Sequence, residues 1–211
     1  MILAGYRNDE PTARAALVSP QVPLRVAALG ALDRLGTLTA ADVNKALADQ
    51  DCAVRRRACE LAWRHPSVAL VRLLDDDDLV VEAAAWALGE RGEAQPEVVA
   101  RLGLVASAHN EPLCREAAVA ALGAIGHQAA LSYILDATTD RPAIRRRAVI
   151  ALANFDGPPV QAALARALED RDWQVRQAAE DLITDRFGGP EPARDHVADP
   201  GSDPTQAPSE D

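Results

Sequence analysis

Three groups of side chains in this sequence could support chemistry: two arginine triplets, a run of aspartates and three cysteines. The triplets Arg55–Arg57 and Arg145–Arg147 have the charge to bind an anion, and the run Asp75–Asp78 has the charge to bind a cation. The thiols could act as nucleophiles or as metal ligands. They are Cys52, Cys59 and Cys114. Each group also has a structural interpretation, which depends on the elements that position it.

The surroundings of these groups argue against catalysis and against metal binding. A nucleophilic Cys59 needs an adjacent base, but its neighbourhood is rich in alanine and leucine and no histidine lies one helical turn away. An EF-hand loop needs a glycine at its sixth position, which the aspartate run lacks. No glycine-rich phosphate loop is present. We therefore expect no catalytic residue, no metal site and no cofactor, and we interpret Asp75–Asp78 as capping the helix that follows.

The composition favours a helical protein without a membrane span. Of the 211 residues, 48% are hydrophobic but only 3% are aromatic, so alanine, leucine and valine supply most of the apolar surface. Such residues suit closely packed helices better than sheets. Neither a long apolar run nor a signal peptide is visible, and the cysteines form no CxxC pair. These features predict a reduced, cytoplasmic protein.

The charge and the prolines separate a tail from the rest of the chain. Residues 188–211 hold six acidic residues against one arginine, a net charge of −5, which leaves −5 of the total −10 for residues 1–187. The same segment holds five prolines and little apolar periodicity. Because it cannot bury enough surface to offset its ordering entropy, we predict a disordered acidic tail at 188–211. Its favoured role is solubility, and docking is the alternative.

Internal repeats organise the remainder of the sequence. Six segments align without gaps, among them VRRRACELAWRHP from Val54 and IRRRAVIALANFD from Ile144. If the first residue of each segment is numbered 0, all six have alanine at +4 and five have arginine at +1, with Val81 as the exception. The segments begin at Leu24, Val54, Val80, Cys114, Ile144 and Val175.

These offsets describe one face of a helix. At about 100° per residue, positions 0, +4, +7, +8 and +11 share a stripe. Alanine on that stripe lets two helix axes approach closely, because a larger side chain would hold them apart. We call the six predicted helices the B helices. Shorter apolar stretches with helical spacing, the A helices, lie between them at 40–49, 67–75, 96–107, 128–138 and 160–170.

The run VR-x-x-A-x-x-A-L-G resembles the HEAT repeat, in the short bacterial form named after phycobilisome lyases. The resemblance covers roughly residues 12–187. It implies an all-α fold, a right-handed α-solenoid of about six HEAT-like helical hairpins, in one domain over residues 1–187 of a bacterial protein. The sequence departs from the pattern at Val81, where the arginine is missing, and in the 26-residue spacing between the second and third repeats. At that spacing the pattern does not determine the local superhelical geometry.

The resemblance also implies a role for the arginines at +1. In that family the arginine typically pairs with an aspartate of a turn, which makes a ladder along the array. Candidate partners here are Asp51, Asp140 and Asp172, which precede their own B helices, or an aspartate of a neighbouring repeat. Arg56 and Arg146, at +2, point about 200° from the stripe and are expected to be free for solvent or a ligand.

Several functions are compatible with such an array. Binding of another protein, as a scaffold or adaptor, is favoured because a solenoid presents a long surface whose repeats can diverge one at a time. An accessory bilin-lyase-like protein or a chaperone for a prosthetic group is the alternative. A di-iron hydroxylase would require His-Glu pairs, and none of the four histidines precedes a glutamate. Nucleic acid is a disfavoured partner, because the repeats are acidic and contain one lysine.

Two tryptophans suggest where the partner binds. Trp63 at +9 and Trp86 at +6 fall about 180° and about 240° from the stripe, so both are expected on the exposed side of adjacent B helices. Tryptophan and arginine are enriched at binding hot spots. The predicted partner-binding patch is Arg56, Trp63 and Trp86; alternatively, the indoles fill the groove between adjacent B helices. Trp173, before the last B helix, is predicted to be a packing residue.

Overall fold

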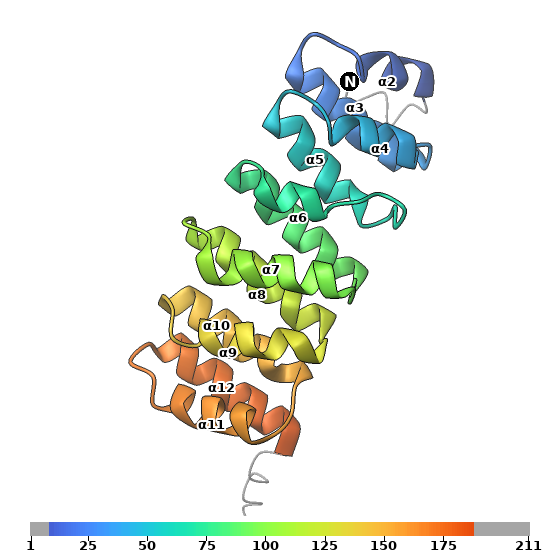
Figure 1. Ribbon diagram of the computed structural model, residues 1–211. Helices are drawn as coiled ribbons and strands as arrows, with labels where there is room; N and C mark the ends of the chain where they lie inside the picture. The colour runs from blue at the N-terminus through green and yellow to red at the C-terminus, as the bar shows by residue number, and fades with distance from the viewer. Residues whose placement is uncertain (1–8, 188–211) are drawn as a thin grey trace, which may run out of the picture.

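The computed structural model describes residues 9–187, which form helices joined by short turns and contain no strand (Figure 1). All six predicted B helices are present. They are α3 (Val22–Leu35), α5 (Cys52–Ala62), α6 (Asp78–Arg91), α8 (Pro112–Ile125), α10 (Pro142–Ala151) and α12 (Trp173–Phe187). The A-side elements are α2 (Glu10–Ala16), α4 (Ala40–Ala46), η1 (Val71–Asp75), α7 (Pro96–Ala108), η2 (Gln128–Ala130), α9 (Leu131–Ala137) and α11 (Pro158–Leu168). A further short 3-10 helix, η3, covers Leu152–Asn154.

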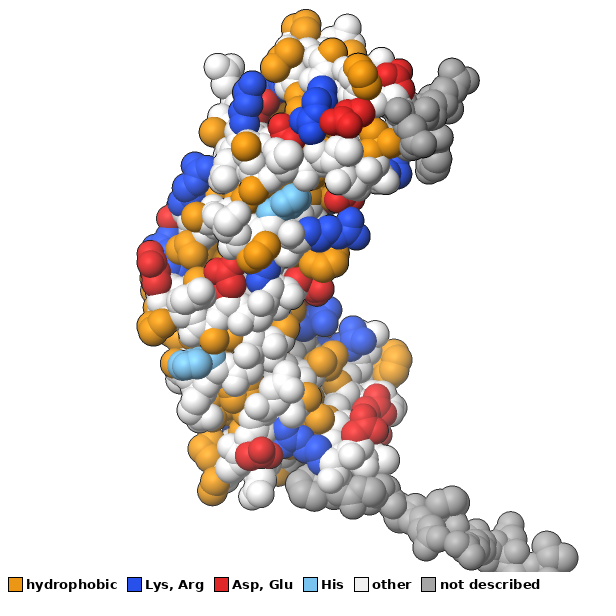
Figure 2. All heavy atoms as spheres, turned by 90° about the vertical axis from the view of Figure 1, so that its right-hand side faces the viewer, with side chains coloured by type: hydrophobic (Ala, Val, Ile, Leu, Met, Phe, Trp, Pro, Cys, Tyr) orange, Lys and Arg blue, Asp and Glu red, His pale blue; other side chains and the backbone are white. Residues whose placement is uncertain are grey.

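Helical hairpins stack into a single elongated array. Successive B helices lie next to one another behind the A helices in Figure 1, and the profile in Figure 2 is curved, with a hollow midway along one side. The prediction of an all-α solenoid of helical hairpins is therefore confirmed. Within residues 9–187, no helix combines the length and the apolar character that crossing a bilayer requires.

Local signals set the ends of many helices. The Asp51 side chain accepts a hydrogen bond of 2.9 Å from the Ala53 N–H and caps the start of α5. Proline occupies the first turn of α8 and α10, where a missing N–H costs nothing. The ends of α3, α6 and α8 have glycine in the left-handed conformation, with φ of 62° to 70°. These glycines are Gly36, Gly92 and Gly126.

The alanine stripe forms the interior of the array. All six alanines at +4 have no exposed surface. They are Ala28, Ala58, Ala84, Ala118, Ala148 and Ala179. Two glycines at +9 bring neighbouring B helices into direct backbone contact. A Cβ on Gly89 would lie 2.9 Å from the Ala121 Cα, and a Cβ on Gly123 would lie 2.6 Å from the Ala151 Cβ.

One predicted A helix is wrong. Residues 67–75 do not form an α-helix; only Val71–Asp75 are helical, as the 3-10 helix η1. The B-helix segments on either side begin 26 residues apart, against 30 and 34 residues for the neighbouring pairs, so fewer residues are left for a helix before α6. The predicted tail at 188–211 lies outside the described residues, so the proposed domain boundary stays a prediction.

Candidate protein-binding surface

The arginines at +1 form a ladder of ion pairs between consecutive repeats. Four of the five pair with an aspartate in the A–B turn of the next repeat, so the neighbouring-repeat alternative is correct for them; Arg176, in the last described helix, donates to the Asp170 carbonyl at 2.7 Å. The own-turn candidates Asp51, Asp140 and Asp172 are wrong as partners of Arg55, Arg145 and Arg176. The Arg–Asp ladder consists of Arg25–Asp49 at 2.8 Å, Arg55–Asp76 at 2.5 Å, Arg115–Asp140 at 2.8 Å and Arg145–Asp170 at 2.7 Å.

Each ladder arginine also donates hydrogen bonds to backbone carbonyls of the turn before its own helix. The Arg55 Nη1 donates to the carbonyls of Asp49 and Gln50 at 2.9 and 3.0 Å, while its other nitrogens bind Asp76 and Asp77. One guanidinium therefore ties the turn before its own helix to the turn before the next. Hydrogen bonds from the arginines hold the pKa of the ladder aspartates below the usual range of a carboxyl group.

The ladder is interrupted between α6 and α8. Val81 replaces the arginine and is completely buried, and His109 occupies the place of the aspartate. The His109 Nδ1 accepts a hydrogen bond from the Glu111 N–H at 3.2 Å, as the Asp49 carboxylate does from the N–H two residues later. His109 thus keeps the turn-forming hydrogen bond of the ladder aspartate and loses its charge.

Three potential metal ligands meet at this interruption, which the sequence did not reveal. The side chains of Asp78, His109 and Cys114 offer ligand atoms within 4.8 Å of one another. The Cys114 Sγ, however, donates to the Asp78 carbonyl at 3.2 Å, and burial, followed by the carboxylates of Asp78, Glu82 and Glu111, raises the thiol's pKa to about 11. Because the Nδ1 of His109 is an acceptor, its Nε2 carries the proton and is not free to ligate. The residues present do not fit a metal ion in this arrangement.

The aspartate run has only part of the predicted role, because Asp78 lies in the first turn of α6 and favours the helix dipole there but the expected capping bond is not made. Asp77 stands at the N-cap of α6 but makes no side-chain capping bond. Asp76 and Asp77 instead accept hydrogen bonds from Arg55, and Asp75 pairs with Arg101. The run therefore joins neighbouring repeats through ion pairs. Cys59 is fully buried, and burial raises its pKa to about 12, as expected of a small core side chain.

The two tryptophans of the predicted patch touch each other. The Trp63 and Trp86 ring centroids lie 6.5 Å apart with the ring planes at 78°, an edge-to-face contact between α6 and the end of α5. The side chains remain 38% and 43% exposed, so packing uses only part of each indole. Arg64 lies 4.8 Å from the Trp63 ring centroid. Arg56 is exposed but not free, because its Nε pairs with Glu60 at 3.1 Å.

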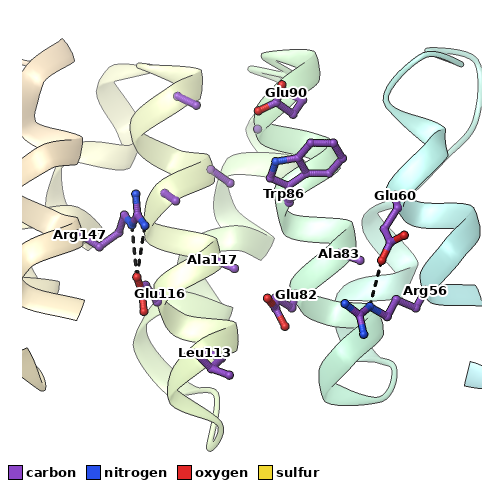
Figure 3. Close-up of a pocket in the computed structure, with 14 residues that line it drawn as sticks. Arg56, Glu60, Glu82, Ala83, Trp86, Glu90, Leu113, Glu116, Ala117 and Arg147 are labelled. Atoms are coloured by element: carbon purple, nitrogen blue, oxygen red, sulfur yellow. Dashed lines mark hydrogen bonds and ion pairs between the residues drawn. The ribbon is translucent and has the colours of Figure 1, made fainter. Parts of the chain in front are cut away.

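A groove opens beside this contact on the B-helix surface (Figure 3). It has a volume of about 440 Å³, and its walls come from α5, α6, α8 and α10. Arg56 and Trp86 line it, whereas Trp63 contacts Trp86 from outside the groove. The lining side chains that the sequence analysis missed include Glu82, Glu90, Leu113, Glu116, Ala117, Ala120, Ala124 and Arg147.

The repeat pattern contains a signal for these missed residues. On α6, Glu82, Trp86 and Glu90 occupy +2, +6 and +10, which fall about 200° to about 280° from the buried stripe. The same offsets on α8 hold Glu116, Ala120 and Ala124, which also line the groove. Trp173 was predicted to be a packing residue, and this is wrong. It is 65% exposed, because it begins α12 and lies outside the helix–helix contact.

Comparisons with known proteins agree with this architecture. Residues 99–184 match a family described as HEAT repeats. An engineered protein has a TM-score of 0.63 at 19% identity, covering 86% of this chain and 99% of that one. YibA of Escherichia coli has a TM-score of 0.62 at 16% identity, covering 86% of this chain and 72% of its own.

A designed armadillo repeat protein in complex with the peptide (KR)4 has a TM-score of 0.61 at 18% identity, covering 82% of this chain and 97% of that one. No curated protein sequence matches the chain. At such identities the structural likeness shows the fold alone. Residues 99–184 are thus similar to HEAT repeats, and the all-helical array with its recurring alanine stripe shows an α-solenoid of helical hairpins.

Proposed function

We propose that this protein is a scaffold or adaptor that binds another protein in the groove between α6 and α8. The observation that supports it most directly is the exposure of two large apolar side chains beside one groove. Trp86 is 43% exposed and Leu113 is 56% exposed, although both line the same hollow. Burying such side chains in a complex is favourable, and tryptophan is the residue type most often found at hot spots.

The small side chains of α8 support the same proposal. Ala117, Ala120 and Ala124 line the groove and leave room for the side chains of a partner. HEAT and armadillo-like arrays commonly present such surfaces to proteins. The predicted cytoplasmic location and bacterial origin remain predictions. The patch of Arg56, Trp63 and Trp86 is retained in the proposal, with Trp63 acting as support for Trp86.

A photo-crosslinking residue in the groove would test this function. Benzoylphenylalanine at Ala124, which is exposed in the groove, should capture the partner in cells that express the protein natively, and mass spectrometry identifies it. The same residue at Ala162, exposed on α11, is the control and should not capture that protein. Equal capture at both positions, or none at Ala124, would contradict the proposal.

A substitution of tryptophan then measures the contribution of the groove. Trp86→Ala should weaken binding of the purified partner at least about tenfold, as expected for a hot spot. Trp173→Ala removes an even more exposed indole outside the groove and should leave binding unchanged. Circular dichroism of both variants verifies that they remain folded. Unchanged binding by a folded Trp86→Ala protein would place the interface elsewhere.

A further inference from the structure

The charges that line the groove are unbalanced. Among the lining residues are four glutamates and two arginines, a net charge of −2. Each arginine is already paired: Arg56 with Glu60 at 3.1 Å, and Arg147 with Glu116 at 3.4 Å, and both pairs are drawn in Figure 3. Glu60 is also reached by Arg57 from outside the groove. Within residues 9–187, no ion pair joins Glu82 or Glu90 to a cation.

The interruption of the ladder lies beside the acidic end of the groove. At the other repeats, an arginine at +1 brings a positive charge to the junction between consecutive B helices. At this junction Val81 and His109 replace both members of the ladder pair, so no ladder arginine lies beside Glu82. Asp78 at the start of α6 and Glu111 at the N-cap of α8 add carboxylates near the junction. The carboxylates of Asp78, Glu82 and Glu111 all raise the pKa of Cys114, which reflects the negative potential there.

The two unpaired glutamates flank the exposed tryptophan. Glu82, Trp86 and Glu90 are four residues apart on α6, so each glutamate lies about 6 Å along the helix axis from the indole and the glutamates lie about 12 Å from each other. An extended peptide covers that distance in about four residues. Arginine suits such a site, because its planar guanidinium can stack on an indole and pair with a carboxylate at the same time. Trp63 is already used in this way by Arg64.

We propose that the groove between α6 and α8 binds an extended basic segment of the partner, with arginine side chains over Trp86 and against Glu82 and Glu90. This proposal rests on the proposed function and adds the chemistry of the partner. Apolar residues of the segment lie between its arginines, against Leu113 and the alanines of α8. The absence of an unpaired arginine among the groove residues disfavours an acidic or phosphorylated segment.

A labelled peptide with two arginines four positions apart, Ala-Leu-Arg-Ala-Leu-Ala-Arg-Ala, is the probe for this site. Fluorescence anisotropy should show that it binds the full chain and that the affinity falls with added salt. The peptide with both arginines replaced by glutamate should not bind. Equal binding of the two peptides would overturn the proposal.

Because the whole chain carries a net charge of −10, charge-matched variants are required. The double change Glu82→Gln with Glu90→Gln should weaken peptide binding at least about tenfold, as expected for the loss of two charge-assisted contacts. The double change Glu97→Gln with Glu169→Gln removes the same charge from exposed positions outside the groove and should have less than about a twofold effect. Equal losses would show that attraction to the whole chain, rather than the groove, binds the peptide.

Binding of the natural partner distinguishes a failure of this proposal from a failure of the proposed function. If Trp86→Ala abolishes its binding while Glu82→Gln with Glu90→Gln does not, the groove binds a protein and the basic segment is wrong. If crosslinking from Ala124 captures nothing, the proposed function itself fails. Retained thermal unfolding midpoints in the glutamine variants verify that the fold is intact.

Discussion

Two consecutive junctions in the row of B helices are built differently. Between α5 and α6, Arg55 clamps two turns through Asp76 and Asp77, and Trp63 packs its ring against Trp86. Between α6 and α8, the positions equivalent to Arg55 and Trp63 hold Val81 and Gly89. The second junction therefore has no ion pair of the ladder, and the backbone of α6 lies directly against Ala121.

The difference shows that the repeat tolerates large changes at +1 and +9 while the alanine at +4 stays buried. The junction between α8 and α10 combines Arg115–Asp140 with the close contact of Gly123. The ladder and the glycine contact are thus independent devices, and each junction uses one or both. The substitution of Val81 for arginine has a local consequence, because no ladder arginine then lies beside Glu82.

Breaking the clamp at the first junction should have the largest effect on stability. Arg55→Met keeps the aliphatic stem but removes the hydrogen bonds to Asp76, Asp77 and two carbonyls, and should lower the free energy of unfolding by about 2 kcal/mol. Arg56→Met, at an exposed neighbouring position, should change it by less than about 0.5 kcal/mol. Urea denaturation measures both, and equal effects would contradict the role given to the ladder.

At the second junction, a single methyl group should be enough to disturb the packing. Gly89→Ala places a Cβ 2.9 Å from the Ala121 Cα, and the resulting overpacking should outweigh the gain in helix propensity, for a net loss of about 1 kcal/mol. Gly30→Ala is the matched control, because its Cβ would meet only the ends of the Arg57 and Arg34 side chains, at 3.2 and 3.4 Å. The control should be neutral or stabilising in thermal unfolding. Stabilisation by both changes would mean that α6 and α8 are not in close contact.

Low pH should weaken the Arg55–Asp76 interaction between α5 and α6, whereas the junction between α6 and α8 has no ladder pair to lose. The pKa of Asp76 is lowered in the folded state by hydrogen bonds from Arg55, so its contribution is present above the unfolded pKa of about 3.9 and is lost as pH falls through the lower folded value. The stability difference between the wild-type protein and Asp76→Asn should therefore narrow as pH falls below about 4. Urea midpoints from about pH 6 to about pH 2.5 test this, and a constant difference would contradict it. Glu97→Gln, which removes one carboxylate at an exposed position, is the control for the loss of a negative charge.

The smallest effect is expected at the tryptophan pair. A double-mutant cycle with Trp63→Ala and Trp86→Ala should give a coupling free energy of about 0.5 kcal/mol, because the rings touch edge to face but remain partly exposed. A coupling above about 2 kcal/mol would make the pair part of the core and would favour the interpretation that the indoles fill the space between B helices.

The B helices could be predicted from the sequence because the information is local. Alanine at +4, the apolar positions around it and the glycines after α3, α6 and α8 recur within single helices, and helical periodicity alone assigns their buried face. The same periodicity placed Trp63 and Trp86 away from the stripe, and both are partly exposed. The 3-10 helix at Val71–Asp75 and the exposure of Trp173 were missed, because both depend on how neighbouring repeats meet.

Which side chains pair between different repeats could be identified only from the tertiary structure. Arg55 and Arg145 have an aspartate in their own turn and another in the next, and only the stacking of repeats selects the aspartate 21 and 25 residues later. The groove depends likewise on the separation of α6 from α8, on the pairing of Arg56 and Arg147, and on the absence of a cation beside Glu82. The chain encodes each helix through side chains three or four residues apart, whereas the surface between helices arises from residues some 30 positions apart that meet only when the repeats are stacked.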